Sequence, residues 1–285
     1  MKSIIFSKMS GAGNDFIVID KNENPECVLS QNAIIKLCNR RTGIGADGVI
    51  LIENSVELDF EMNYYNSDGS FGSLCGNGAR CAIKFANFSG RCGISSIRFK
   101  ANTKVYSGEV LDDDQIKFNL NPPSKLKYNF KIKVFGQLVN ASFADTGSPH
   151  IVVNINDVSE NPKDPRLKFQ DLNKFPVIQI GKELRYASEF LPGGTNVNFI
   201  LVEGEKVYVR TYERGVEDET WACGTGAAAA ALITYITQKL KPPITIVPKS
   251  SEELIVDFKI ENNKVNKLSL TGPAKIVFTG QIQIT

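Results

Sequence analysis

The sequence predicts an α+β fold of two similar, pseudo-symmetric domains, each a mixed, barrel-like sheet wrapped around a central helix. Three observations lead to this expectation. Short β-rich segments dominate the 285 residues, helical segments are few, and two distant stretches share one layout of strand, polar loop, Cys-Gly-x-Gly and apolar helix. At 42% hydrophobic, the chain is also long enough for two cores of ordinary domain size.

The strand-like segments run along the whole chain as short β-branched and aromatic runs. In the first half they are "FIVID", "VILIE", "FEMNYY", "SIRFKA" and "QIKFNL". In the second half they are "HIVVNI", "NFILVE", "KVYVRTY", "ITIVP", "LIVDFKI" and "KIVFTGQIQI".

Three helices are predicted between these strands. The first runs from Gln31 to Arg40 and is capped by Ser30. The other two begin at the paired motifs, from Gly76 to Phe88 and from Gly224 to Lys239. Two prolines after the last helix forbid its continuation.

The two motif-bearing stretches align on their cysteines. They are "FEMNYYNSDGSFGSLCGNGARCAIKFANF" and "VYVRTYERGVEDETWACGTGAAAAALITYI", and "GNDFIVID" with "TNVNFILVE" forms a second, weaker pair. Such self-similarity indicates an internal duplication. A boundary between the two halves is expected near "NLNPPSK", where two prolines interrupt the strand pattern.

Composition favours a small-molecule partner. The formal net charge is only +2 and the basic residues are scattered, so no face of the chain is typical of nucleic-acid or membrane binding. No apolar run is long enough for a signal segment or a membrane span, and a cytoplasmic protein is expected. Six cysteines without a secretory signal are then expected as thiols, which makes thiol chemistry available.

The paired Cys-Gly-x-Gly motif can combine a reactive thiol with a carboxylate site. A cysteine directly before a helix meets unsatisfied amide N–H groups and the positive end of the helix dipole, and both favour the thiolate. The following glycines leave bare amides that suit a carboxylate. If the halves face one another, Cys75 and Cys223 flank one ligand, and inversion of a stereocentre that bears hydrogen needs two such acid/bases.

The remaining titratable residues admit ordinary structural roles. The cysteines outside the paired motifs are expected to be structural, and these are Cys27, Cys38, Cys81 and Cys92. No Cys/His cluster predicts a metal site. His150 is the only histidine, and a buried structural imidazole is its ordinary role. Glu213 and Arg214 end a strand one loop before Cys223, where they could bind a zwitterionic ligand.

Two rival functions are left open by the residues alone. "GIGADG" and "GTGAAA" satisfy dinucleotide-binding patterns, so a nicotinamide- or flavin-dependent oxidoreductase is one alternative function. The first motif, however, follows a helix and enters a strand, and an acidic loop parts the second from its strand. A non-enzymatic amino-acid-binding protein is the other rival, but it gives no reason for both thiols.

Six segments taken together resemble the diaminopimelate epimerase family across nearly the whole chain: "KMSGAGNDF", "RTGIGADG", "NSDGSFGSLCGNGARC", "GSPH", "GTNVNF" and "YERGVEDETWACGTGAAA". The resemblance implies an isomerase that needs no pyridoxal phosphate, other cofactor or metal and interconverts LL- and meso-2,6-diaminopimelate, in lysine and peptidoglycan precursor synthesis. It also implies a homodimer, with a last strand that returns to the first domain. The expected domains are residues 1–121 with 271–285, carrying Cys75, and residues 122–270, carrying Cys223.

The resemblance also assigns roles to individual residues. It makes Cys75 and Cys223 the two acid/bases, with His150 and Glu213 tuning the thiols. The backbone amides that hold the reacting carboxylate are those of Gly76, Asn77, Gly224 and Thr225. The side chains that recognise the substrate are those of Asn14, Asn66, Asn196, Glu213 and Arg214.

Three positions depart from the family pattern, and a related activity is the alternative. Gly48 stands where a glutamine can contact substrate, Ser148 where an asparagine is frequent, and Trp221 where a smaller residue is usual. Proline racemase and hydroxyproline epimerase share the superfamily and the cysteine pair. The Glu213–Arg214 pair favours diaminopimelate, because a proline substrate has no distal ammonium and carboxylate to bind there.

Overall fold

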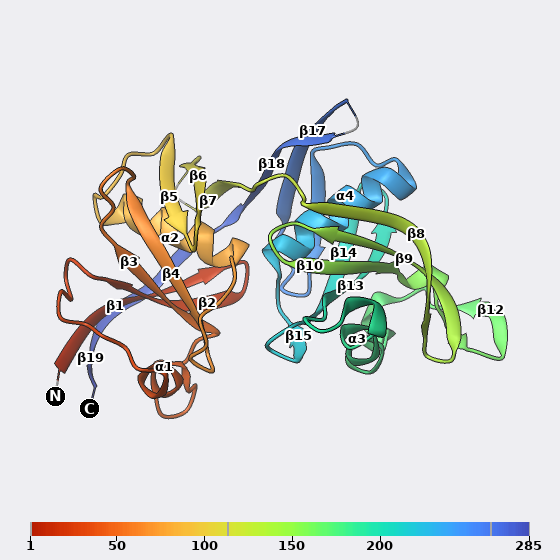
Figure 1. Cartoon of the computed structure of the whole chain (residues 1–285), viewed down its shortest axis with the longest axis horizontal. Helices are drawn as coiled ribbons and strands as arrows, with labels where there is room; N and C mark the ends of the chain where they lie inside the picture. The colour runs from red at the N-terminus through yellow and green to blue at the C-terminus, as the bar shows by residue number, and fades with distance from the viewer. Residues whose placement is uncertain (1, 113, 263, 285) are drawn as a thin grey trace. The chain divides into compact units, whose positions relative to one another are not determined.

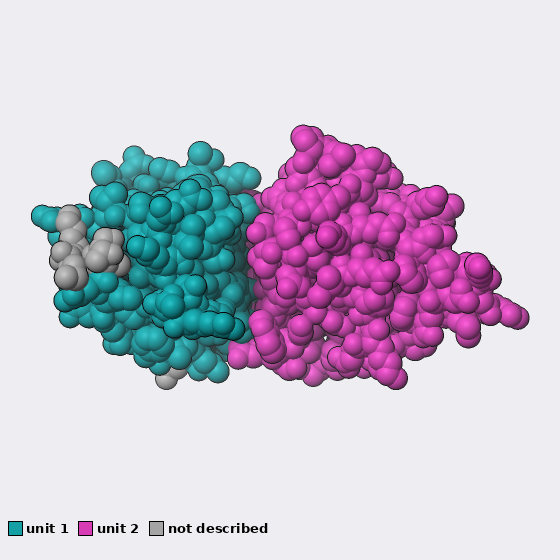
Figure 2. Space-filling view, turned by 90° about the horizontal axis from the view of Figure 1, so that it is seen from below, with its two compact units in different colours: residues 1–119, 271–285 teal, residues 120–270 magenta. Residues whose placement is uncertain are grey.

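The computed structural model describes residues 2–112, 114–262 and 264–284 (Figure 1). The chain divides into two compact units, coloured separately in Figure 2. Unit 1 comprises residues 1–119 and 271–285, and unit 2 comprises residues 120–270. The first division lies between Asn119 and Leu120, slightly before the position expected from the prolines.

Unit 1 is built on one mixed sheet. Its strands are β1 (Lys2–Gly11), β2 (Asn14–Asp20), β3 (Gly48–Glu53), β4 (Phe60–Asn66), β5 (Ile97–Ala101), β6 (Lys104–Val110), β7 (Gln115–Asn119) and β19 (Lys275–Ile284). They pair in the order β19–β1–β2–β3–β4–β5–β6–β7. The β2–β3 and β4–β5 pairs are parallel, and the others are antiparallel.

Two helices accompany this sheet. Helix α1 (Gln31–Cys38) is capped by the Ser30 hydroxyl, which accepts from the backbone N–H of Ala33 at 3.2 Å. It ends before Arg40, where it was predicted to end, because the extended Asn39 turns the chain. Helix α2 (Gly76–Phe88) has the predicted bounds, and it contacts β1, β2, β3, β4, β6, β7 and β19. The central helix predicted for this half is therefore α2 (Figure 1).

Unit 2 has a second mixed sheet and a small separate hairpin. Its strands are β8 (Lys125–Val134), β9 (Gln137–Asp145), β10 (Pro149–Asn154), β13 (Asn196–Glu203), β14 (Lys206–Glu213), β15 (Asp218–Thr220), β16 (Ile244–Pro248) and β17 (Leu254–Glu261), with hairpin strands β11 (Ser159–Asn161) and β12 (Asp164–Lys168). Strand β18 (Lys264–Pro273) begins in unit 2 and crosses the division at residue 270. The short 3-10 turns are Ile155–Asp157, Leu172–Lys174 and Ser188–Phe190. The sheet pairs as β8–β9–β10–β13–β14–β16–β17, with β10–β13 and β14–β16 parallel.

Helix α4 (Gly224–Gln238) is the central helix of unit 2. Its first eleven residues are all buried, and it contacts strands β8, β9, β10, β13, β14, β16 and β17. It stops one residue short of the predicted end because Lys239 adopts a left-handed conformation with φ 61°. Helix α3 (Val177–Arg185) was not predicted, although its buried residues recur at helical spacing and pack on β13, β14 and β15.

The two units repeat one topology. In both, strands pair in the same sequence of antiparallel and parallel steps, and the central helix follows the equivalent strand, β4 or β14. β2 is thus equivalent to β10, and β3 to β13. The pairing of "GNDFIVID" with "TNVNFILVE" was therefore wrong: the first segment is β2, whereas the second contains β13. The predicted fold class is confirmed, and α1 and α3 also occupy equivalent places.

A buried ion pair ties the end of β2 to the loop after α2. The Nε of Arg91 donates to Asp20 Oδ2 at 2.9 Å, and its Nη2 donates to Asp20 Oδ1. Both side chains are at most 7% exposed. Removal of one partner from a buried ion pair destabilises the folded protein, because it leaves the other charge buried without a counter-charge.

Asp20→Asn should destabilise the protein by about 3 kcal/mol, because it leaves the buried Arg91 guanidinium without a counter-charge. The measurement is the free energy of unfolding from a denaturant titration. Glu253→Gln is the control, since the Lys206–Glu253 pair is exposed, and its titration should overlay that of the wild type. Equal midpoints for the two variants would contradict this account.

Candidate active site

Cys75 lies at the N-cap of α2, where the sequence placed it. Its half-buried Sγ accepts from the backbone N–H of Gly78 at 3.4 Å. On its other side, Sγ lies 3.6 Å from Asn14 Oδ1, to which the thiol donates. Asn77, the second residue of α2, is fully buried and donates through Nδ2 to the same Asn14 oxygen at 3.3 Å. The structure thus brings Asn14, Cys75, Gly76 and Asn77 together.

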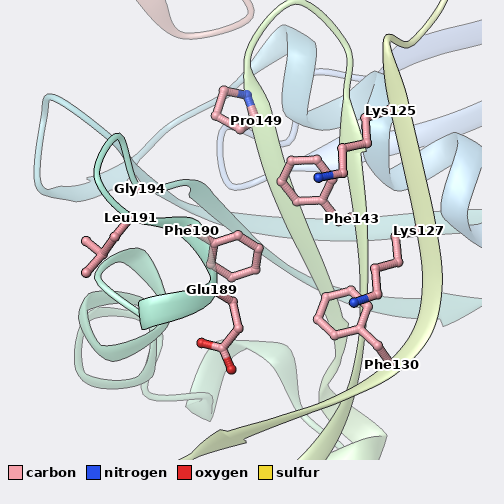
Figure 3. A pocket seen from close by; sticks show the side chains of 9 residues that line it. All are labelled: Lys125, Lys127, Phe130, Phe143, Pro149, Glu189, Phe190, Leu191 and Gly194. Carbon is pink, nitrogen blue, oxygen red and sulfur yellow. The ribbon is translucent and has the colours of Figure 1, made fainter.

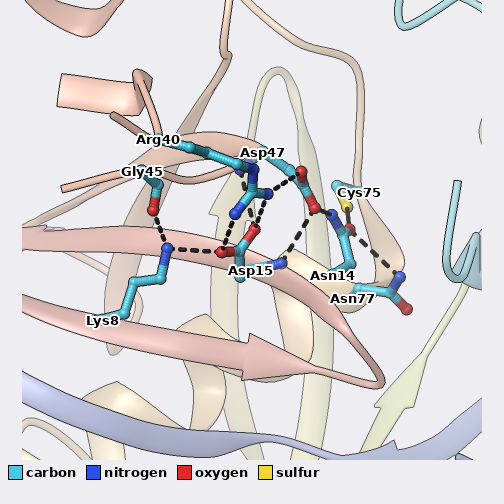
Figure 4. Close-up of polar contacts among 8 residues, drawn as sticks. All are labelled: Lys8, Asn14, Asp15, Arg40, Gly45, Asp47, Cys75 and Asn77. Atoms are coloured by element: carbon cyan, nitrogen blue, oxygen red, sulfur yellow. Dashed lines mark hydrogen bonds and ion pairs between the residues drawn. The ribbon is translucent and has the colours of Figure 1, made fainter. Parts of the chain in front are cut away.

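A cluster of charged residues lies behind Asn14 (Figure 4). Lys8 Nζ donates to Asp15 Oδ2 at 2.6 Å and also to the carbonyl of Gly45. Arg40 binds Asp15 through both terminal nitrogens and reaches Asp47 Oδ1 at 2.7 Å. Burial raises the pKa of Asp15, but hydrogen bonds and charges from Arg40 and Lys8 outweigh it and lower this pKa to about 2. Burial and the charge of Asp15 raise the pKa of Asp47.

Cys223 is the N-cap residue of α4, equivalent to Cys75. It is half-buried, and its Sγ lies 3.6 Å from Thr225 Oγ1. The second glycine of the motif, Gly226, is required here: a Cβ on it would lie 2.4 Å from Asn198 Oδ1. Thr225 is held in place by Thr146, whose hydroxyl donates to the Thr225 carbonyl at 2.8 Å.

His150 is fully buried on β10, and its ring contacts the Thr225 hydroxyl. Asn198 accepts from Thr211 through Oδ1, so its Nδ2 faces His150 Nδ1 at 3.1 Å as a donor. The ring proton is therefore on Nε2, which lies 2.9 Å from the hydroxyls of both Thr225 and Ser148. Burial, with the charge of Arg214, lowers the pKa of His150 to about 3.

The other residues predicted for unit 2 form a second polar group. Asn196 is 4% exposed; its Nδ2 donates to Ser148 Oγ at 3.2 Å and to the Pro149 carbonyl at 2.9 Å. Its Oδ1 accepts from the backbone N–H of Arg214 at 2.9 Å, which fixes the chain beside Glu213. Thr220 donates to Glu213 Oε2 at 2.8 Å. Asn196 thus joins the Ser148–His150 cluster to the Glu213–Arg214 turn.

Asn66 and Gly48 lie opposite one another at the paired ends of β4 and β3. The Asn66 amide donates to Ser70 Oγ at 3.0 Å within the loop that leads to Cys75. A Cβ at Gly48 would lie 2.4 Å from the Tyr65 carbonyl oxygen, so this position accepts no larger residue without a backbone shift. Close packing against β4 therefore accounts for glycine, rather than glutamine, at position 48.

A separate pocket in unit 2 holds none of the predicted residues. Its volume is about 260 Å³, and Figure 3 shows lysines over aromatic rings at its wall. Lys127 Nζ lies 4.4 Å from the Phe130 ring centroid, and Phe143 stacks on Phe190 at 5.7 Å. Its lining residues Pro149 and Gly194 adjoin the His150 and Asn196 segments in sequence.

Three of the remaining cysteines, Cys38, Cys81 and Cys92, have environments that suppress the thiolate. Burial raises the pKa of Cys38 and Cys81 to about 12 and that of Cys92 to about 11. Within residues 2–112, 114–262 and 264–284, no group of three His, Cys, Asp or Glu side chains could hold a metal ion. In the same described residues, no helix has the length and apolarity that a bilayer crossing needs. The "GIGADG" motif runs from the end of α1 into β3, the reverse of a dinucleotide-binding turn.

Comparison with known proteins identifies the family. The family model described as diaminopimelate epimerase matches residues 6–126 and 142–277. The diaminopimelate epimerase of Chlorobaculum tepidum is 40% identical over 279 residues, which cover 97% of this chain and 100% of that protein. This chain belongs to the diaminopimelate epimerase family. The resemblance seen in the motifs is confirmed, and the chain is an isomerase of the epimerase type.

Solved structures show the same fold at much lower identity. The Bacillus anthracis phenazine biosynthesis protein of the PhzF family has a TM-score of 0.70 at 13% identity, covering 100% of both chains. A probable proline racemase from Agrobacterium radiobacter also has a TM-score of 0.70, at 12% identity, and covers 99% of this chain and 93% of that one. These likenesses establish the fold of the epimerase family member but not its substrate.

Several residues of the site were missed from the sequence. They are the charged cluster Lys8, Asp15, Arg40 and Asp47 in unit 1, and Asn198, Thr211 and Thr146 in unit 2. Some lay within quoted motifs: Asp15 in "GNDF", Asp47 in "GIGADG" and Asn198 in "TNVNF". A polar residue directly beside a predicted site residue was the available signal.

We expect His150 to remain neutral, with the proton on Nε2, from pH 5 to pH 9. Nitrogen-15 NMR of histidine-labelled protein measures this directly, since the chain has a single histidine. In the unfolded chain His150 binds a proton near pH 6.5, whereas in the folded chain its pKa is about 3. Stability therefore falls as pH drops below 6.5. A ring that titrates near pH 6.5 in the folded protein would contradict the assignment.

Proposed function

We propose that this chain interconverts LL- and meso-2,6-diaminopimelate by proton transfer at the α-carbon, with Cys75 and Cys223 as the two acid/bases. One observation carries the proposal: each unit places a half-buried cysteine at the N-cap of its central helix, followed by the same Gly-x-Gly. Duplicated thiols suit a reaction that removes a proton from one face and returns one to the other.

The proton balance needs no other reactant. A thiolate takes the α-proton, the C–H electron pair is delocalised into the substrate carboxylate, and the opposite thiol donates its proton to the other face. In the reverse direction the thiols exchange roles. The reaction is an isomerisation, so neither oxidant nor reductant is consumed.

The helix N-termini are the proposed carboxylate site. The first backbone N–H groups of a helix have no intrahelical partner and sit at its positive end. In α2 these include Gly76 and Asn77, and in α4 Gly224 and Thr225. They would stabilise the negative charge that develops on the carboxylate as the proton leaves.

The substrate assignment rests on the named relatives and on the polar side chains around each thiol. The proposed recognition residues are Asn14, Asn66, Asn196, Glu213 and Arg214. Burial and the nearby Arg185 lower the pKa of Arg214, so a bound carboxylate would relieve an unfavourable environment. Asn196 supports this pair through its bond to the Arg214 backbone.

His150 and Glu213 are proposed to tune the thiol of Cys223. Because neutral His150 contacts Thr225, and Thr225 contacts Cys223, its influence would pass through the threonine hydroxyl. We further propose that the protein acts in the cytoplasm as a homodimer, with residues 1–121 and 271–285 as one epimerase half and 122–270 as the other. The resemblance to the family supports these assignments.

Incubation of the reduced protein with LL-diaminopimelate in deuterium oxide tests the reaction. Deuterium should enter the α-position as the meso isomer appears, because the returned proton comes from solvent-exchanged thiol. Proton NMR and chiral chromatography follow the two events together. Exchange with proline or hydroxyproline but not with diaminopimelate would move the assignment to the racemase branch.

Cys75→Ala and Cys223→Ala should each lower kcat for epimerisation by at least about 10³-fold, since each removes one acid/base. Cys92→Ala is the matched control, because the pKa of Cys92 is raised and it lies outside both motifs. Its kcat should equal that of the wild type. Near-normal turnover in either motif variant, with an unchanged circular dichroism spectrum, would refute the two-thiol mechanism.

A further inference from the structure

Two side-chain amides beside Cys75, those of buried Asn77 and half-buried Asn14, form a chain of hydrogen bonds with one direction. Arg80 is fully buried on α2, and its Nη2 donates to Asn77 Oδ1 at 3.0 Å. Asn77 Nδ2 then donates to Asn14 Oδ1 at 3.3 Å, and Asn14 Nδ2 donates to Asp47 Oδ2 at 2.5 Å. Figure 4 shows the Asn77–Asn14–Asp47 part of this chain and the approach of Cys75 to its middle.

The charged ends of the chain decide its direction. A guanidinium can only donate hydrogen bonds, and an ionised carboxylate can only accept them. Donation from Arg40 and from the Asp15 N–H favours the ionised form of Asp47. With Asp47 ionised, Arg80 at one end and Asp47 at the other leave each amide a single orientation. Reversal of Asn14 alone would set its NH2 group against the NH2 of Asn77 and its oxygen against the Asp47 carboxylate.

Asp47 is itself held as an acceptor. Its Oδ1 accepts from Arg40 Nη2 at 2.7 Å, and its Oδ2 also accepts from the backbone N–H of Asp15 at 3.2 Å. Arg40 is fixed by its two-point contact with Asp15, which Lys8 holds from the other side. Within the described residues, Asn14, the Asp15 backbone and Arg40 all donate to the Asp47 carboxylate.

We propose that Asp47 is a positioning residue that locks Asn14 Oδ1 toward Cys75 and thereby holds Cys75 as the protonated thiol in the ligand-free protein. The thiol donates to Asn14 Oδ1 at 3.6 Å, whereas a thiolate there would face an oxygen with nothing to donate. An acceptor that stabilises the neutral form raises the pKa of an acid.

Other groups around Cys75 include some that favour its thiolate and some that favour its thiol. The Gly78 N–H and the start of α2 favour the thiolate, but sulfur can accept from Gly78 while its own proton goes to Asn14. The charged and titratable groups near this site include Lys8 on β1, Asp15 on β2, Arg40 and Asp47 between α1 and β3, and Arg80 and Cys81 on α2. The same elements and β4 also carry Asp20 on β2, Tyr64 and Tyr65 on β4 and Lys84 on α2. Burial keeps Cys81 a thiol, with its pKa raised to about 12.

Unit 2 lacks this device at the equivalent positions. In the paired registers, Phe16 lies opposite Gly48 and His150 opposite Asn196, which makes Ser148 equivalent to Asn14 and Thr195 to Asp47. The aligned helix starts make Thr225 equivalent to Asn77 and Ala228 to Arg80. In unit 2 the hydroxyls of Ser148 and Thr225 thus stand in place of the two amides, and the neutral residues Thr195 and Ala228 stand in place of the two charged ones. Cys223 therefore faces Thr225 Oγ1, which can donate or accept.

The consequence for catalysis rests on the two-thiol function proposed above. With Cys75 held as the acid, the free enzyme would begin turnover with Cys223 as the base. The protonation of Cys75 itself is a property of the ligand-free protein and can be measured without any substrate.

The test is the pH dependence of iodoacetamide alkylation at each cysteine, resolved by peptide mass spectrometry. In the wild type, the pKa of Cys75 should exceed that of Cys223, and this comparison needs no variant. In Asp47→Asn, the new amide can donate as well as accept, so Asn14 is no longer locked. The pKa of Cys75 should fall by about one unit, with about tenfold faster alkylation at pH values below both pKa values.

Two matched variants separate orientation from charge. Asp15→Asn removes a negative charge from the same cluster but no acceptor of Asn14, and it should shift the pKa of Cys75 much less than Asp47→Asn. Asp47→Glu keeps an acceptor-only carboxylate and should stay closer to the wild type. A Cys75 pKa below that of Cys223 in the wild type, or equal shifts in Asp15→Asn and Asp47→Asn, would overturn the proposal. Because no substrate is used, failure here leaves the deuterium-exchange result, and the proposed epimerisation, untouched.

Discussion

The enclosure of one helix by each sheet is the constraint on which the rest of the structure depends. A helix that contacts strands along most of its circumference must be narrow and must pair any polar side chain it buries, and α4 meets this with its buried run of glycine, threonine and alanine. Its first turn still carries backbone N–H groups without intrahelical partners. The residue at the N-cap, Cys75 in one unit and Cys223 in the other, is therefore placed beside these donors by the fold itself.

The glycines of the motif follow from the same enclosure. Gly226 leaves space for Asn198, whose Oδ1 would lie 2.4 Å from any added Cβ, and Asn198 in turn sets the tautomer of His150. In unit 1, Gly78 donates to the Cys75 sulfur, and a Cβ on it would meet Ile50 Cδ1 at 3.2 Å. Close packing thus fixes both where each thiol lies and which polar groups can reach it.

Local signals in the sequence were enough for some elements and not for others. Helix α2 could be predicted to the residue because Cys-Gly-x-Gly marks its start. Helix α3 begins after Pro176 with Val177 and Ile178, residues that favour strands, and its contacts with β13, β14 and β15 outweigh that preference. The candidate residues around Cys75 could likewise be named from motifs, whereas the bonds from Arg40 to Asp15 join residues 25 positions apart in the chain. Neither spacing nor periodicity reports such contacts.

A duplicated fold supplies two equivalent thiols, but the two-thiol reaction proposed above starts from one protonation state and needs them to differ. Equivalent backbones with the same helix dipole would give Cys75 and Cys223 similar tendencies to ionise. The difference must then come from side chains at equivalent positions, and the largest contrast lies there: an amide pair with charged ends in unit 1, and a hydroxyl pair beside a neutral imidazole in unit 2. An amide between an arginine and an aspartate has one orientation, whereas a hydroxyl can reverse its bond by rotation. The unit with the fixed direction holds its proton, and the unit with the reversible direction can give up its own or take one back.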